Sequence, residues 1–320
     1  MPQLKLRAEA EIASARKKRW TVFVVASVVI VLILAIVGVS LYFSEDAKYK
    51  RLTIITVDDT SIDMDYFLKR IRLAGSTTTG MLVELRNELL IKIEAPRYIA
   101  EVSPEDIDLV LRGIASGESE TISEDEFKEW YRQQLNEIDL SDSEYRDYIG
   151  TLILRIRLFG YLAERVSTVA EQVHLYIIVV ETYEDAEEIR VRWEAGEDFA
   201  DLAREVSLDE VTGENGGDSG WMPRGVLPSG FDQVVFNLTI DDVSEPQGFL
   251  PDPTTSDEIR YCLLMVSEKA EAREIDENPL QVLKSQALEN WLSEEGKLHE
   301  IDWNYDSEID AWINFQLAKE

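Results

Sequence analysis

The first hydrophobic feature of the chain is an uninterrupted apolar run near its start. Thr21 to Phe43 contains no charged side chain, and a helix needs about 20 such residues to cross a bilayer. The run is apolar on all sides, which suits lipid better than one buried face. Trp20 and Tyr42 stand where interfacial aromatic residues are common. The pattern predicts a tail at residues 1–20 and a single transmembrane helix at residues 21–43.

Basic residues flank this run unequally and indicate its orientation. Six precede it and three follow it: Lys5, Arg7, Arg16, Lys17, Lys18 and Arg19, then Lys48, Lys50 and Arg51. The positive-inside rule therefore predicts a cytoplasmic N-terminus and an extracytoplasmic body. A cleaved signal peptide is the alternative, but its apolar region is usually about 7 to 15 residues and ends at a small-x-small site, which is not evident here. We expect an uncleaved anchor in the cell membrane.

Residues 52–168 repeat a helical spacing of apolar positions. Capping boxes that start at Ser103, Ser123 and Ser141 predict successive helices, and a brief strand is expected at Ile54 to Val57. Two runs have their apolar residues on one helical face, namely Leu82, Leu85, Leu89, Leu90 and Ile93, and Leu152, Ile153, Ile156, Phe159 and Leu162. This part of the chain is predicted to be a helical lobe.

Helical spacing returns in residues 278–320. A first helix is expected after Pro279, and a second after a cap at Ser307 to Asp310. Trp291 and Trp312 lie on the apolar faces of these helices, where exposure would be costly. We therefore expect residues 278–320 to pack on the lobe at 52–168, which would make that lobe discontinuous in sequence.

Between these helical parts, residues 171–270 follow a mixed pattern. His174 to Val180 is short, β-branched and apolar, as in a buried strand, and Thr182 to Asp185 caps a helix that ends at Gly196. A stretch rich in glycine and proline follows, and Tyr261 to Val266 reads as a closing strand. The predicted fold class is α+β, with a small, mostly antiparallel sheet flanked by helices.

Composition excludes several classes of function. The chain has 63 acidic against 32 basic residues, a net charge of −31, so it offers no basic surface for nucleic acid. One cysteine and two histidines provide neither a disulfide nor a usual zinc site. We expect no metal, no cofactor and no nucleic-acid partner, and we interpret the acidity as a device for solubility.

The order of motifs in the α+β part resembles a parvulin-type (PpiC) peptidyl-prolyl isomerase domain. The motifs that carry the resemblance follow one another over about a hundred residues: Ile177 to Thr182, Phe199-Ala-Asp-Leu-Ala203, Ser207-Leu-Asp209, Gly216-Gly-Asp-Ser-Gly-Trp221, Phe231 to Phe236, Val243-Ser-Glu-Pro246 and Tyr261 to Val266. The anchor and the two helical parts are similar in layout to exported foldases of the PrsA and SurA class. The resemblance implies a membrane-held foldase that acts on newly exported or unfolded polypeptides.

The resemblance also implies site residues and a mechanism. Leu227, where the family usually has methionine, would form a proline socket with Phe231, together with Met222 and Phe236. Asp209 matches the acidic or thiol position beside the substrate carbonyl, and it would disfavour the conjugated amide electrostatically. Such catalysis needs no covalent step, because the barrier of about 20 kcal/mol comes from amide resonance. The enzyme has to bind the twisted bond better than either planar form.

Two positions depart from the family pattern. Ile177 stands where the first strand normally opens with histidine, and Cys262 replaces the histidine of the closing strand. His174 lies three residues before Ile177, so along a strand it faces the opposite side and does not substitute. Segment 247–260 also departs and suggests an altered loop beside the socket. The polar network of the family site is therefore expected to be absent, which leaves isomerase activity open.

Each singled-out residue also has a purely structural interpretation. Leu227, Phe231 and Phe236 could be ordinary core residues, Asp209 a turn or cap residue, and Cys262 a small buried hydrophobic residue. Three functions remain open: a membrane-tethered prolyl isomerase, a non-catalytic chaperone or peptide-binding module, and an assembly factor for one complex.

Overall fold

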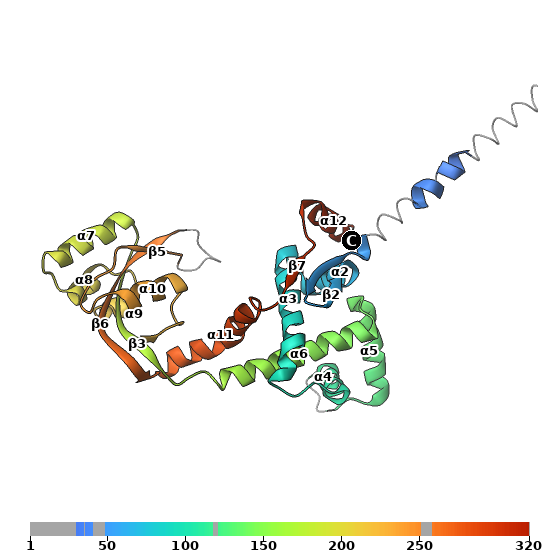
Figure 1. The fold of residues 1–320 in the computed structure, drawn as a ribbon, viewed down its shortest axis with the longest axis horizontal. Coiled ribbons are helices and arrows are strands. Elements are labelled where there is room, and N and C mark those ends of the chain that lie inside the picture. Colours follow the sequence, from blue (N-terminus) through green and yellow to red (C-terminus); the bar gives the residue numbers. More distant parts are fainter. Residues whose placement is uncertain (1–29, 35, 41–48, 118–120, 251–257, 320) are drawn as a thin grey trace, which may run out of the picture. The chain divides into compact units, whose positions relative to one another are not determined.

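The computed structural model describes residues 30–34, 36–40, 49–117, 121–250 and 258–319 (Figure 1). The predicted tail at 1–20 lies outside these residues, as does part of the predicted anchor at 21–43, whose described positions are helical and exposed. None of the helices in the described ranges combines the length and apolar character that a membrane crossing requires.

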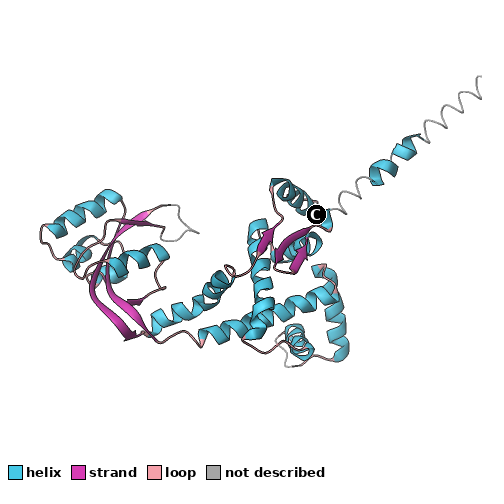
Figure 2. Cartoon of the chain, viewed as in Figure 1, coloured by secondary structure: helices cyan, strands magenta, loops and turns pink. Residues whose placement is uncertain are grey.

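The chain divides into two compact units. Unit 1 comprises residues 1–93, 104–150 and 296–320, and unit 2 comprises residues 94–103 and 151–295. Helices and antiparallel sheets occur in both units (Figure 2), so the predicted α+β class is confirmed.

Unit 1 combines a small sheet with helices. Its elements are β1 (Thr53–Val57), β2 (Thr60–Asp63), α2 (Met64–Ala74), α3 (Thr78–Glu94), α4 (Pro104–Ser116), α5 (Glu124–Ile138), the start of α6 (Asp142–Ala163), β7 (Ile301–Trp303) and α12 (Ser307–Leu317). The predicted strand at Ile54 to Val57 is confirmed as β1, and it lies between β2 and β7 with both neighbours antiparallel. The first and last parts of the described chain thus meet in one sheet.

A buried ion pair joins α2 to α3 in unit 1. The Arg70 guanidinium donates to both carboxylate oxygens of Glu88, at 2.7 and 2.8 Å, and the two side chains are only 1% and 4% exposed. The ring of Tyr148 in α6 lies 4.2 Å from the Arg70 guanidinium carbon. Charges enclosed in this way are tolerated only when they are paired and hydrogen-bonded.

Unit 2 is built on a four-stranded antiparallel sheet in the order β4-β3-β6-β5. Its elements are the short 3-10 helix η1 (Ala95–Arg97), the end of α6, β3 (Val169–Val180), α7 (Tyr183–Glu194), α8 (Phe199–Val206), α9 (Glu210–Glu214), β4 (Asp218–Pro223), α10 (Ser229–Asn237), β5 (Gln247–Phe249), β6 (Arg260–Glu274) and α11 (Glu277–Glu295). The predicted antiparallel sheet with flanking helices is confirmed.

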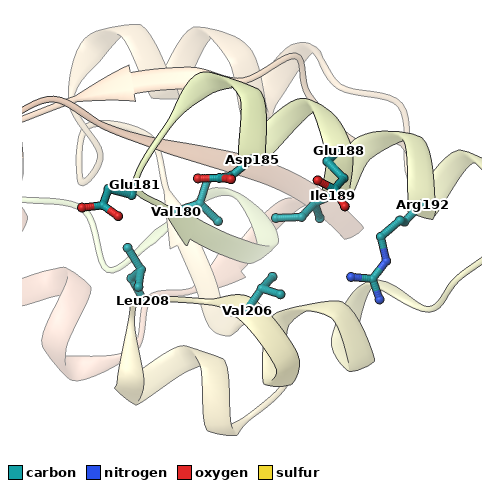
Figure 3. A pocket seen from close by; sticks show the side chains of 8 residues that line it. All are labelled: Val180, Glu181, Asp185, Glu188, Ile189, Arg192, Val206 and Leu208. Atoms are coloured by element: carbon teal, nitrogen blue, oxygen red, sulfur yellow. The ribbon is translucent and has the colours of Figure 1, made fainter.

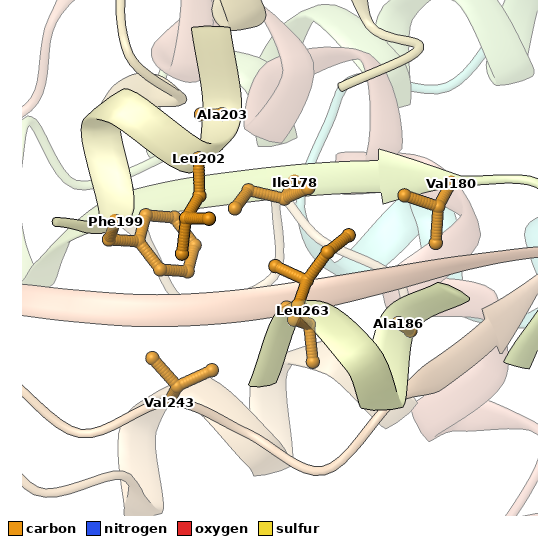
Figure 4. Close-up of a cluster of buried hydrophobic side chains, with 9 residues drawn as sticks. Ile178, Val180, Ala186, Phe199, Leu202, Ala203, Val243 and Leu263 are labelled. Atoms are coloured by element: carbon orange, nitrogen blue, oxygen red, sulfur yellow. The ribbon is translucent and has the colours of Figure 1, made fainter. Parts of the chain in front are cut away.

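Strand alternation gives this sheet two apolar faces. On one face, Ile178 and Val180 of β3 and Leu263 of β6 pack against α7 and α8 (Figure 4). On the other face, the alternate residues of β3 and β6 pack against α10. Since successive side chains in a strand point to opposite sides, a single pair of strands supplies both cores.

The double glycine before β4 holds that strand against β3. Gly217 accepts a hydrogen bond from the Ile177 amide at 2.8 Å, and its φ of +83° is readily available only to glycine. A Cβ at Gly217 would lie 2.7 Å from the Ile177 carbonyl oxygen, and one at Gly216 would lie 2.7 Å from the Ala200 Cβ. The two glycines therefore serve close backbone packing as well as a turn.

Several local expectations need correction. Strands β3 and β6 extend well beyond the predicted 174–180 and 261–266, because they pair with each other as far as Val169 and Glu274. The predicted apolar face of α6 is only partly right, since Ile156 is 71% exposed whereas Leu158 is buried. Helix α12 is capped by Asp306, which accepts from the amides of Glu308 and Ile309, and not by Ser307.

The two tryptophans expected on apolar helix faces each pack against an aromatic ring. Trp291 of α11 meets Tyr98 edge to face at 6.1 Å, and Trp312 of α12 stacks on Tyr49 at 5.0 Å. The first contact lies within unit 2 and the second within unit 1. Residues 278–320 therefore contribute one helix to each unit.

Candidate functional site

A partly exposed apolar surface lies on the α10 face of the unit 2 sheet. Ile177, Met222, Leu227 and Phe231 are half-buried there and pack on a buried cluster that contains Phe236 and Cys262. The structure thus brings together six of the seven residues singled out from the sequence. Phe236 is only 6% exposed, and the Arg224 guanidinium covers its ring at 3.9 Å. Phe236 therefore packs beneath the exposed residues of this surface and has little exposed area with which to contact a ligand.

A half-buried carboxylate holds the loop that carries Leu227. Asp232 of α10 accepts a hydrogen bond from the Gly225 amide at 2.6 Å, and Leu227 also hydrogen-bonds to it through its backbone. Burial raises the pKa of Asp232 above its ordinary value. These bonds tie the loop between β4 and α10 to the first turn of the helix that carries Phe231. The one signal for this role in the sequence is a carboxylate directly after Phe231 in the first turn of this helix.

Phe249 extends the apolar surface and was not predicted. Its ring lies 6.0 Å from that of Phe231 at an interplanar angle of 74°, an edge-to-face arrangement. Phe249 ends β5, which pairs with Tyr261 and Cys262 of β6. The residue lies in segment 247–260, where the resemblance failed, so no motif identified it.

Asp209, the seventh of these residues, is linked to β3 through Ser207 and is not part of this cluster. The hydroxyl of Ser207 accepts from the amide of Val179 at 3.2 Å and from that of Asp209 at 3.3 Å, and the Val179 side chain belongs to the buried cluster. Oδ1 of Asp209 caps α9 by accepting from the amides of Val211 and Thr212. The capping role considered for Asp209 is therefore real, and it fixes where the carboxylate points.

Ile177 and Cys262 make the base of this surface apolar. Ile177 belongs to β3, whereas Cys262 of β6 is fully buried and pairs across the ladder with Val179. Burial raises the pKa of the Cys262 thiol to about 12. The Cys262 sulfur is surrounded by apolar side chains, which do not favour a reactive thiolate.

We expect Cys262 to be inert to alkylation in the folded protein. At pH 8 its reaction with iodoacetamide should be at least about 100-fold slower than in denaturant, since the thiolate forms only after opening. Because it is the single cysteine, mass spectrometry reports one site. Labelling at equal rates in both states would contradict the burial.

The same burial predicts a pH effect on stability. The unfolded thiol ionises near pH 9.0 and the folded one only near 12. The unfolded state therefore loses its proton first, so the contribution of Cys262 to stability is present below pH 9 and is lost as the pH rises above it. The Cys262→Ala variant should lack this component in unfolding titrations.

His174 belongs to the opposite face of the sheet, as its offset from Ile177 predicted. Its Nε2 lies 3.0 Å from Asp218 Oδ1 and its Nδ1 lies 3.2 Å from Ser267 Oγ, while its ring stacks on Trp221 at 5.3 Å. His174 is half-buried within β3. His174 contacts Asp218 and Trp221 of β4 on this opposite face, so it does not replace a family histidine.

Comparison with known families assigns a class to this part of unit 2. The rotamase family, described as the PPIC-type PPIASE domain, matches residues 179–249. Unit 2 of this chain therefore carries a PpiC-type peptidyl-prolyl isomerase domain.

Relatives of the chain include PrsA foldases. The foldase protein PrsA of Halalkalibacterium halodurans is 48% identical over 69 residues, which are 22% of this chain and 21% of that protein. The periplasmic chaperone PpiD of Haemophilus ducreyi is 37% identical over 75 residues, 23% of this chain and 12% of that protein. The matched part spans only about a fifth of the first of these relatives. The PrsA peptidylprolyl isomerase structure from Bacillus anthracis covers 75% of this chain and 96% of its own, with 20% identity and a TM-score of 0.37.

Proposed function

We propose that this protein is a membrane-anchored extracytoplasmic foldase whose PpiC-type domain accelerates prolyl isomerisation in newly exported polypeptides. The observation that carries the proposal is the half-buried apolar surface of Met222, Leu227 and Phe231 in a domain of this family. Its aromatic and aliphatic side chains suit a proline ring, which has no N–H to satisfy. The PrsA relatives, which are foldases by name, support the wider role.

In this proposal, the chemistry consists of binding the twisted amide. Rotation about the prolyl bond faces a barrier of about 20 kcal/mol because the planar amide is conjugated. Leu227 and Phe231 hold the ring, and the apolar groups at Ile177 and Cys262 keep water from the amide, whose planar form has the larger dipole. The Asp209 carboxylate, placed toward the substrate carbonyl oxygen, disfavours the negative charge that resonance puts there. Every one of these effects lowers the barrier without a proton transfer.

A protease-coupled proline-peptide assay on the full chain tests the proposal. We expect Phe231→Ala and Asp209→Asn each to lower kcat/KM about tenfold, which corresponds to about 1.4 kcal/mol of transition-state stabilisation. Asparagine also caps helices, so Asp209→Asn keeps α9 intact while it removes the charge.

Two matched controls separate activity from stability. Asp198→Asn changes an equivalent cap on α8, and Phe315→Ala removes a 57% exposed phenylalanine from unit 1. Both should retain the full rate. A wild-type rate equal to the uncatalysed background, or an Asp209→Asn rate equal to the wild type, would refute the proposed mechanism.

A second candidate is a non-catalytic chaperone or peptide-binding module. It is favoured by the apolar residues Ile177 and Cys262, which stand where the family has histidines and cannot maintain a polar network. Suppression of client aggregation that survives Asp209→Asn, together with a background isomerisation rate, would favour this candidate over the first.

A further inference from the structure

Apart from the apolar surface on the α10 face, unit 2 has a pocket at the end of β3. Its volume is about 240 Å³, and eight residues line it: Val180, Glu181, Asp185, Glu188, Ile189, Arg192, Val206 and Leu208. The α7 residues Asp185, Glu188, Ile189 and Arg192 recur at the spacing of one helical face. Figure 3 shows this face on one side of the pocket and Val206 and Leu208 on the other.

The pocket has an apolar base and an acidic rim. Val180 and Ile189 are buried and Val206 is half-buried, whereas Leu208 keeps 46% of its surface exposed. Glu181, Asp185 and Glu188 are exposed around this base. The single cation, Arg192, is already paired with Glu197 at 2.7 Å and with Glu205 at 2.8 Å. Within the described residues, neither Glu181 nor Glu188 forms an ion pair, so the rim keeps a net negative charge.

This pocket is adjacent in sequence to the candidate catalytic residue Asp209. The Leu208 amide donates to the Val179 carbonyl at 2.7 Å, which fixes the segment before Asp209 along the end of β3. Leu208 lines the pocket, and Asp209 is the next residue, about 3.8 Å further along the Cα trace. An extended chain advances about 3.3 Å per residue, so a peptide whose proline lies by Asp209 reaches the pocket within a few residues.

We propose that this pocket binds a lysine or arginine side chain of the client polypeptide close to its proline. Only such side chains combine a long apolar stem, which fits Val180, Ile189, Val206 and Leu208, with a cationic end for Glu181, Asp185 and Glu188. A purely apolar side chain would desolvate the carboxylates without compensation, and an acidic one would be repelled. The inference rests on the proposed function, since it specifies the client class of the same domain.

Matched peptides test this inference on the full chain. A fluorescent peptide with one proline carries lysine, norleucine or glutamate at each of three positions before and after it, and anisotropy gives the dissociation constants. We expect lysine to be favoured over norleucine about fivefold at one or two positions, the size expected for a few partly exposed ion pairs. Salt should weaken this preference, because exposed charges are screened.

Variants of the rim carboxylates test whether the preference for lysine over norleucine arises at this pocket. In Glu181→Gln/Glu188→Gln the lysine and norleucine peptides should bind about equally, with the norleucine affinity unchanged. The matched control Glu184→Gln/Glu214→Gln removes two exposed carboxylates that do not line the pocket, and it should keep the preference. Equal binding of lysine and norleucine peptides by the wild type, or a preference that persists in Glu181→Gln/Glu188→Gln, would overturn the inference.

Isomerisation rates of the same peptides, measured by exchange NMR, separate the two proposals. Lysine preference without acceleration supports the pocket and refutes the isomerase. Acceleration without any charge preference refutes the pocket and leaves the isomerase supported. Absence of peptide binding refutes both.

Discussion

Replacing Gly217 with alanine is expected to destabilise unit 2 by about 2 to 5 kcal/mol. Part of the cost is the left-handed backbone, about 1 to 2 kcal/mol for a residue with a Cβ. The larger part is steric, because the new Cβ would lie 2.7 Å from the Ile177 carbonyl oxygen, and backbone cannot yield as a flexible side chain does. The hydrogen bond from the Ile177 amide to Gly217 joins β3 to the turn before β4, so its loss should loosen both strands.

Hydrogen exchange at the Ile177 amide measures this effect locally, which matters because a chain of two units need not unfold in one step. Gly220→Ala is the matched control: its φ is +78°, but a Cβ there would meet nothing within 4 Å. It should show the backbone cost alone, about 1 to 2 kcal/mol. Equal effects of the two substitutions would show that close packing at Gly217 contributes nothing.

Removal of the charge of Glu88 should have a similarly large effect on unit 1. Glu88→Gln leaves the Arg70 guanidinium, 1% exposed, with only the longer 3.5 Å pair to the partly exposed Glu84, and breaking a buried pair in this way costs about 3 to 5 kcal/mol. The ring of Tyr148 can offset only a fraction of that cost. Denaturant unfolding followed by circular dichroism measures the change.

Two further variants distinguish pairing from packing. Glu129→Gln breaks an exposed pair with Arg132 and should cost less than about 1 kcal/mol. Arg70→Met/Glu88→Met removes both charges and should recover most of the stability lost in Glu88→Gln, because well-packed apolar residues can replace a buried pair. A double variant less stable than Glu88→Gln would indicate that the polar contacts of Arg70, and not its charge balance, hold α2 on α3.

The parts of the fold that sequence predicts well are those with strong local signals. Ser123 forms the predicted capping box with Glu126, and Thr182 accepts from the Asp185 amide at the start of α7. The long polar ends of β3 and β6 carry no such signal: Glu268 and Lys269 are exposed and lack alternation, and they become strand residues only through pairing with His174 and Val173. Likewise, Ile301 to Trp303 is too short to be recognised as a strand before β1 is present beside it.

The candidate site shows the same division. Motif order identifies Met222, Leu227 and Phe231, and the fold places them on one surface. Phe249 and Asp232 could not be found in this way, because their roles depend on the tertiary contacts with Phe231 and with the amide of Gly225. The pocket at Glu181 and Leu208 is also a product of tertiary structure, since it joins a strand end, a helix face and a loop.

The pairing of β1 with β7 affects the order in which the protein can fold during synthesis. Ile55 of β1 pairs with Trp303 of β7, so the sheet of unit 1 cannot be completed until residue 303 has been synthesised. The strands of unit 2 lie between them in sequence and need no residue beyond Glu274 for their ladders. Because loop closure over such a distance is slow, we expect the PpiC-type domain to fold first as the chain is synthesised. A chain truncated before β7 would then have a complete four-stranded sheet in unit 2, whereas the sheet of unit 1 would lack its third strand.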